Sequence, residues 1–161
     1  MENNTICLIG LGYVGLPLAV AFAEKFQVVG FDINGDRIQE LKNGHDKSLE
    51  IEDDLLESVK PNIVYTDNIK DTGDCNIYII TVPTPIDSAN RPDLTPLVES
   101  SKAVGTVINL GDLVIFESTV YPGVTEDICV PELERSSDLT FNKDFFCGYS
   151  PERINPGDKE H

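Results

Sequence analysis

The chain alternates between short apolar runs and longer stretches in which apolar residues recur every three or four positions. Short apolar runs are typical of buried β-strands, and the longer pattern is typical of amphipathic helices. The pattern predicts strands over residues 5–9, 27–31, 63–65, 75–82, 112–116 and 145–149. It predicts helices over residues 13–25, 37–41, 52–59, 95–108 and 125–134. This alternation indicates an α/β fold with a doubly wound, mostly parallel sheet and helices on both faces.

The first predicted strand runs into a glycine-rich turn with the spacing Gly10-x-Gly12-x-x-Gly15. Each glycine has its own physical reason in a nucleotide-binding turn. Gly10 permits the tight turn, Gly12 lets backbone N–H groups approach a pyrophosphate, and Gly15 lets the following helix pack against the strand. The N-terminus of that helix then faces a bound anion. Because glycine turns also occur without any ligand, the motif needs supporting context.

That context is Asp32, which ends the second apolar run. It stands about 20 residues beyond the glycine turn, where a dinucleotide-binding fold places an acidic residue. A carboxylate at this position accepts hydrogen bonds from the ribose hydroxyls of NAD. Together, the glycine turn and Asp32 predict a Rossmann-type fold with NAD as its cofactor.

Polar residues also follow the later strands, at the edge where open parallel sheets bind ligands. Pro83-Thr84-Pro85 opens a stiff loop after the fourth predicted strand, and Glu117-Ser118-Thr119 follows the fifth. Thr84 is either a nucleotide contact or part of a rigid connector, and the pattern alone leaves both open. Glu152 and Arg153 follow the last strand and form either a general base beside an anion clamp or an exposed ion pair.

Composition and charge narrow the class of protein. The chain has 161 residues, 40% hydrophobic and 25% charged, and we expect one globular domain over residues 1–161. The net charge of −16 would repel nucleic acid and anionic lipid, so neither is an expected partner. A cytoplasmic location is expected, because no apolar run is long enough for a membrane span and the N-terminus lacks a positively charged secretion signal.

The cysteines and histidines form no catalytic or metal-binding pattern. Four cysteines are scattered without C-x-x-C spacing, at Cys7, Cys75, Cys129 and Cys147. We expect buried, reduced thiols and no metal site. The two histidines, His45 and His161, lie in a polar loop and at the end of the chain. Neither is a candidate base, which disfavours a hydroxyacid dehydrogenase that depends on a catalytic histidine.

Four motifs carry a resemblance to a known family: Gly10–Pro17, Val82–Pro85, Glu117–Gly123 and Ser150–Gly157. In this order they resemble the nucleotide-sugar 6-dehydrogenases, the UDP-glucose/GDP-mannose dehydrogenase family. The resemblance covers the whole chain but only the family's N-terminal, NAD-binding domain. It therefore implies a fragment that lacks the central and C-terminal substrate domains. The Pro-Glu-Arg-x-x-Pro-Gly form is similar to the branch that acts on UDP-N-acetylhexosamines in capsule and Vi-type polysaccharide synthesis.

The resemblance implies oxidation of the sugar C6 alcohol to a carboxylate with two NAD⁺, through an aldehyde held on a cysteine. That nucleophilic cysteine is implied to lie outside this chain, because none of the four cysteines stands in the family's cysteine motif. A UDP-sugar substrate, bound together with the absent domains, is also implied. The full-length enzyme is implied to be a homodimer or a higher oligomer.

The resemblance also assigns residues. It implies cofactor contacts from the glycine turn, the second strand and the later strand ends, namely Gly10, Gly12, Tyr13, Val14, Gly15, Asp32, Arg37, Pro83, Thr84, Ser118 and Thr119. Two catalytic residues are implied: Thr119 beside the nicotinamide, and Glu152 acting on water or a proton during thioester hydrolysis. Glu152 and Arg153 are implied to contact the sugar nucleotide. The UDP-glucose branch carries a second acidic residue where this chain has Pro156, so that role is not carried over.

Two interpretations from different classes remain. The first is the N-terminal part of an NAD-dependent nucleotide-sugar dehydrogenase, inactive as an isolated fragment. The alternative is a stand-alone NAD-sensing or regulatory module without catalysis. Such a module would need Gly10 to Asp32 but would have no use for the polar clusters at Glu117–Thr119 and Glu152–Arg153. Those two clusters therefore favour the enzyme.

Overall fold

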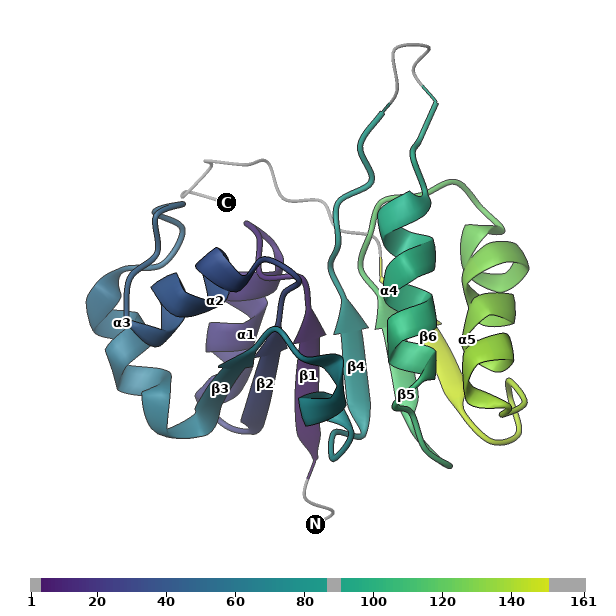
Figure 1. The fold of residues 1–161 in the computed structure, drawn as a ribbon, viewed down its shortest axis with the longest axis horizontal. Helices are drawn as coiled ribbons and strands as arrows, with labels where there is room; N and C mark the ends of the chain where they lie inside the picture. The colour runs from purple at the N-terminus through teal and green to yellow at the C-terminus, as the bar shows by residue number, and fades with distance from the viewer. Residues whose placement is uncertain (1–3, 87–90, 151–161) are drawn as a thin grey trace.

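The computed structural model describes residues 4–86 and 91–150. Its centre is a parallel sheet of six strands in the order β3-β2-β1-β4-β5-β6 (Figure 1). The strands are β1 (Thr5–Ile9), β2 (Gln27–Phe31), β3 (Ile63–Thr66), β4 (Ile77–Ile80), β5 (Leu113–Phe116) and β6 (Phe146–Tyr149). The order reverses between β1 and β4, which gives a doubly wound sheet its switch point. The predicted fold class is confirmed.

Helices cover both faces of the sheet, and each face has its own hydrophobic core. One core is closed by α1 (Gly15–Ala23), α2 (Gly35–Lys42) and α3 (Asp53–Val59). The other is closed by α4 (Thr95–Gly105), the π-helical turn η3 (Thr125–Cys129) and α5 (Val130–Ser137). Two short 3₁₀ turns, η1 (Lys60–Asn62) and η2 (Ile69–Thr72), flank β3.

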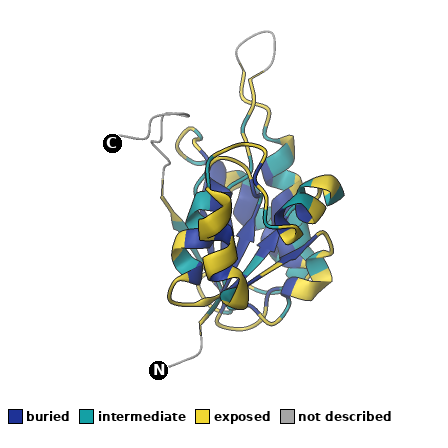
Figure 2. Cartoon of the chain, turned by 90° about the vertical axis from the view of Figure 1, so that its left-hand side faces the viewer, coloured by how far each residue is buried: buried dark blue, intermediate teal, exposed yellow. Residues whose placement is uncertain are grey.

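The central strand β1 contributes to both cores. Ile6 and Leu8 pack into the core beneath α1, whereas Cys7 and Ile9 pack into the core beneath α4. This division follows from the pleat of a strand, which sends successive side chains to opposite faces. Figure 2 shows the strands as the buried centre of the molecule, with the outer faces of the helices exposed. Burial on both faces explains why the sequence of β1 is a continuous apolar run.

The predicted elements all occur, but several of their ends differ. The predicted helix over residues 13–25 begins only at Gly15, because Tyr13 and Val14 belong to the preceding turn. The predicted helix over residues 125–134 starts as a wider π turn in which Val130 N–H donates to the Thr125 carbonyl. The physical reason is Pro131, which has no N–H to continue the α-helical pattern.

The helices α4 and α5 approach each other closely at Gly105. A Cβ atom placed on Gly105 would lie 2.7 Å from Cβ of Ser136 and 3.0 Å from the carbonyl oxygen of Leu133. Real Cβ atoms essentially never come as close as the first of these distances. The absence of a side chain at Gly105 therefore sets the spacing of the two helices.

We expect Gly105→Ala to lower the free energy of unfolding by about 1–3 kcal/mol, because the added methyl group overpacks this contact. Chemical denaturation measures the change. Gly105→Ala combined with Ser136→Gly should recover part of the loss, since it removes the nearest atom. If Gly105→Ala alone stabilised the protein, the close contact between α4 and α5 would be contradicted.

Candidate functional site

A cleft of about 780 Å³ opens at the carboxyl ends of the central strands. Its walls are the glycine turn after β1, the end of β2, the loops after β4 and β5, and one face of α4. This position is the switch point of the sheet, where open α/β sheets bind ligands. The volume is also typical of a cleft that binds a cofactor.

The structure brings most of the predicted cofactor residues together. Nine of them line the cleft: Gly10, Gly12, Tyr13, Val14, Asp32, Pro83, Thr84, Ser118 and Thr119. Gly15 and Arg37 lie behind the lining, where they support the turn. Glu152 and Arg153 fall outside the described residues.

The three glycines of the turn differ in their surroundings. Gly10 has a φ of +95°, in the left-handed region that favours glycine. A Cβ on Gly15 would overlap the Gly10 carbonyl oxygen and the Thr81 hydroxyl, so only glycine permits α1 to start this close to β1 and β4. A Cβ on Gly12, in contrast, would meet no atom within 4 Å.

The open space at Gly12 fits an anionic group. It lies beside the start of α1, where the first backbone N–H groups of a helix have no partner within the helix. The N-terminal end of a helix also carries a partial positive charge. A side chain at Gly12 would fill this space, whereas a pyrophosphate placed there would find N–H donors and a favourable field.

Asp32 connects the end of β2 to the glycine turn. One carboxylate oxygen accepts from Leu11 N–H at 2.8 Å, and the other accepts from Asn34 N–H at 2.9 Å. Each carboxylate oxygen has two lone pairs, so each retains one acceptor position. Because Asp32 borders the cleft, it can accept hydrogen bonds from two ribose hydroxyls while it holds the turn.

Arg37 lies next to the glycine turn but does not line the cleft. Its Nε donates to the Leu11 carbonyl at 3.0 Å, and its Nη1 pairs with Glu40 and, at 2.7 Å, with Asp46. The resemblance implies a cofactor contact from Arg37; in the structure its guanidinium binds the Leu11 carbonyl, Glu40 and Asp46, and Arg37 does not line the cleft. No sequence pattern predicts this arrangement, because Glu40 and Asp46 have the pattern of ordinary surface residues.

The loops after β4 and β5 are tied to each other at the opposite end of the cleft. The Ser118 hydroxyl donates to the Val82 carbonyl at 2.7 Å, and the Thr84 hydroxyl donates to the Thr119 carbonyl at 3.0 Å. Each hydroxyl oxygen can still accept a hydrogen bond. The loops therefore form a fixed polar wall, and the connector and contact roles of Thr84 are compatible.

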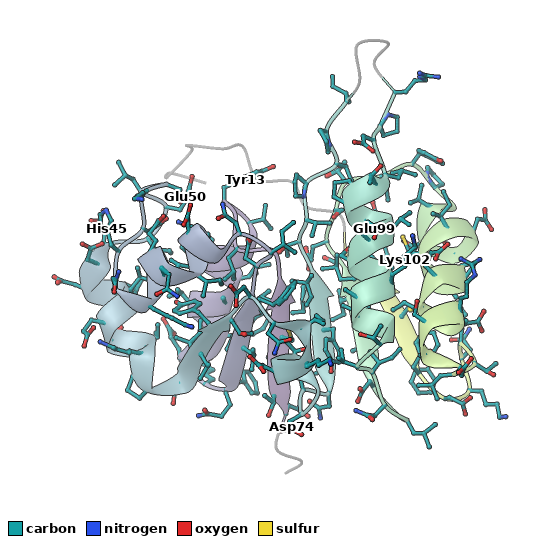
Figure 3. The ribbon with its side chains drawn as sticks, viewed as in Figure 1. Tyr13, His45, Glu50, Asp74, Glu99 and Lys102 are labelled. Atoms are coloured by element: carbon teal, nitrogen blue, oxygen red, sulfur yellow. The ribbon has the colours of Figure 1, made fainter. Side chains whose placement is uncertain are left out.

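Sequence reasoning missed the wall that α4 provides. Its cleft-facing residues are Pro96, Glu99, Ser100 and Ala103. Their spacing of three, four and seven positions marks one face of a helix and was the available signal. Figure 3 shows Glu99 on α4 and Tyr13 across from it at the rim of the glycine turn. Ile33, which is 87% exposed and lines the cleft beside Asp32, was also missed.

The cysteines lie away from this site. In the described part of the chain none of them lines the cleft, and all four are free thiols. Burial raises the pKa of Cys129 to about 11 and that of Cys147 to about 12. Thiols with such pKa values stay protonated at neutral pH and are poor nucleophiles.

Residues 4–86 and 91–150 contain neither a metal-binding cluster nor a membrane-spanning helix. These ranges contain no cluster of three or more histidine, cysteine, aspartate or glutamate side chains that could hold a metal ion. Within the same ranges, no helix combines the length and the apolar character needed to cross a bilayer.

A parallel sheet in this order, with a glycine turn and a carboxylate at adjacent strand ends, defines an NAD-binding domain of the dehydrogenase type. The particular family follows from comparison with known proteins. Residues 4–161 match the NAD binding domain of the UDP-glucose/GDP-mannose dehydrogenase family. The chain belongs to this family, and NAD is its cofactor.

The comparison also identifies similar proteins. The chain is 57% identical to a UDP-N-acetyl-D-glucosamine 6-dehydrogenase of Pseudomonas aeruginosa and 60% identical to one of Salmonella typhi, over 161 residues in each case. These alignments cover all of this chain and 38% of each relative. The solved UDP-D-ManNAc dehydrogenase of Pyrococcus horikoshii is 38% identical, with a TM-score of 0.87 over 95% of this chain and 37% of that one. The chain thus spans well under half the length of these relatives.

Gly12→Ala should leave the fold intact and weaken NAD binding. The new methyl group meets no protein atom, so we expect the free energy of unfolding to stay within about 0.5 kcal/mol of the original. The same methyl group takes the space assigned to the pyrophosphate, and calorimetric titration should show at least about a tenfold loss of NAD⁺ affinity.

Gly15→Ala is the matched contrast, because its Cβ overlaps the Gly10 carbonyl oxygen and it should lower stability as well. Unchanged NAD⁺ affinity in Gly12→Ala would mean that the pyrophosphate binds elsewhere.

Proposed function

We propose that this chain is the NAD-binding part of an enzyme that oxidises the C6 alcohol of a UDP-N-acetylhexosamine to the uronate in two NAD-dependent steps. The observation that carries the proposal is the 57–60% identity, along the whole chain, to two UDP-N-acetyl-D-glucosamine 6-dehydrogenases. Both relatives are named for a catalysed reaction, which favours the enzyme over an NAD-sensing module.

The residues of the cleft suit the cofactor part of this reaction. NAD⁺, when bound, supplies the hydride acceptor for the alcohol carbon. In the proposal the glycine turn binds the pyrophosphate and Asp32 binds the adenosine ribose. The polar wall of Thr84, Ser118 and Thr119 borders the nicotinamide, and Thr119 is the residue of this wall assigned to the reacting end.

The second oxidation needs groups that the described part of the chain does not provide. An aldehyde can be carried to the acid level through a covalent cysteine adduct, which requires a reactive thiolate. The raised pKa values of the Cys129 and Cys147 thiols support a nucleophile outside this chain. Glu152 is proposed to act on water or a proton, and Arg153 to contact the sugar nucleotide. Both lie outside the described residues.

The proposal extends to assembly and location. A homodimer or higher oligomer of the full-length enzyme is supported by the outer strand β6, where Phe146 and Tyr149 are 45% and 46% exposed. Apolar groups on an outer strand favour contact with another domain or copy. A cytoplasmic location is supported by the four free thiols, which suit a reducing compartment.

We expect the chain to bind NAD⁺ at least about ten times more tightly than NADP⁺. Asp32 would face the additional 2′-phosphate with like charge. Arg37 cannot offset that repulsion without giving up its ion pairs to Glu40 and Asp46. Calorimetric titration with each cofactor measures the ratio, and equal or tighter binding of NADP⁺ would contradict the assignment of Asp32 to the ribose.

Turnover by the full-length enzyme tests the function itself. With NAD⁺ and UDP-N-acetylglucosamine the full-length enzyme should release NADH. This chain alone should bind NAD⁺ but release no NADH. Glu152→Gln in the full-length enzyme should retain NAD⁺ binding and slow acid formation by ~10²–10⁴, because glutamine cannot transfer a proton. Steady NADH release by this chain alone would refute the division of labour between its residues and those of the remaining domains.

A further inference from the structure

We propose that Thr81 is a positioning residue for the cofactor: its hydroxyl fixes the Gly10–Leu11 peptide group, and that peptide group holds the Asp32 carboxylate at the adenosine ribose. This role rests on the proposed assignment of Asp32 to the ribose, which it deepens. Thr81 stands just before the Val82–Pro85 motif, and neither the motifs nor the family comparison give it a role. It follows β4, on the other side of β1 from Asp32 at the end of β2 (Figure 1).

The Thr81 hydroxyl lies between the ends of β4 and β1. Its oxygen is 2.8 Å from the Gly10 carbonyl oxygen and 3.1 Å from the Ile9 carbonyl oxygen. A hydroxyl donates only one proton, and the Ile9 carbonyl already accepts from the Thr81 N–H at 2.9 Å. The contribution that the side chain alone makes is therefore the shorter bond, to the Gly10 carbonyl.

The lack of a side chain at Gly15 provides the space for this hydroxyl. A Cβ atom on Gly15 would lie 2.4 Å from the Thr81 hydroxyl oxygen. Thr81 is also stiff at χ1, because the two heavy atoms on its Cβ restrict the rotamers it can adopt. Contact with Gly15 and restricted rotation together keep the hydroxyl on the glycine turn.

The same peptide group carries a bond to Asp32. The atoms of a trans peptide lie in one plane, and its C=O and N–H point in opposite directions. The Gly10 carbonyl accepts from Thr81, and the Leu11 N–H of that plane donates to Asp32 at 2.8 Å. The two side chains approach from opposite sides of β1, because β4 and β2 are its two neighbours in the sheet. The peptide plane is thus held at both ends.

The orientation of this plane matters for the ribose. The Asp32 carboxylate is fixed by two bonds, from Leu11 N–H to one oxygen and from Asn34 N–H to the other. These bonds set the directions of the lone pairs that remain for the ribose hydroxyls. Without the Thr81 hydroxyl the peptide plane can rotate, so Asp32 keeps its charge but loses part of its orientation. Recognition of the ribose hydroxyls should therefore weaken.

The test is Thr81→Val, which keeps the shape of the side chain and removes the hydroxyl. Calorimetry with ADP and 2′-deoxy-ADP measures how strongly the chain recognises the 2′-hydroxyl. In the unmodified chain we expect ADP to bind at least about tenfold more tightly than 2′-deoxy-ADP, as for a hydrogen bond to a charged group. In Thr81→Val this ratio should fall to about threefold or less, because Asp32 is no longer held in the accepting direction.

Two further variants are matched controls. Thr81→Ser keeps the hydroxyl and should keep the ratio of the two affinities. Thr72→Val removes a buried hydroxyl that donates to the Ile69 carbonyl, also at 2.8 Å, from a residue that does not line the cleft. It should lower the stability of the chain, as Thr81→Val does, but leave the ratio unchanged.

A second measurement needs no ligand. In ¹⁵N NMR spectra of the free chain, Thr81→Val should shift the Leu11 amide resonance, whereas Thr72→Val should not. If Thr81→Val fails to fold, Thr81→Cys, with a weak S–H donor, should give an intermediate ratio. An unchanged ratio in the Thr81 variant without the hydroxyl, or an equal fall in Thr72→Val, would overturn the positioning role. Equal binding of ADP and 2′-deoxy-ADP by the unmodified chain, or binding of neither, would instead refute the proposed cofactor site.

Discussion

The structure depends on the close approach of α1 to the glycine turn at Gly15. No atom larger than hydrogen fits on the Cα of Gly15, because the Gly10 carbonyl oxygen and the Thr81 hydroxyl occupy that space. This contact brings the start of α1 against the ends of β1 and β4, at the switch point of the sheet. That geometry produces the cleft and the open space at Gly12. It also brings the partial positive charge at the N-terminus of α1 to the cleft.

The cleft is held in shape by side chains that bind backbone groups. Asp32 and Arg37 fix the peptide groups of Leu11, while Ser118 and Thr84 tie the loops after β4 and β5 together. The cofactor site is therefore a local property of this chain. Chemistry on a sugar is different, because it requires a substrate carbon held against the nicotinamide and a reactive thiolate.

The sequence predicted the order of the elements, the glycine turn and Asp32, because each of these has a local signal. The π turn before α5 was not predicted, since it depends on how Pro131 disturbs a helix that the apolar pattern describes correctly. The contacts of Arg37 could not be predicted either, because Asp46 joins it through a loop that has no periodic pattern. Glu152 stays a prediction, because it lies outside the described residues.

Amide hydrogen exchange with and without saturating NAD⁺ tests the central claim most directly, since it reports backbone protection residue by residue. The account predicts slower exchange at residues 11–14 and 117–119 when NAD⁺ is bound. It also predicts no change at the opposite edge of the sheet, around Asp74 at the bottom of Figure 3. Protection confined to that opposite edge, or no protection of the glycine turn at saturating NAD⁺, would contradict the account.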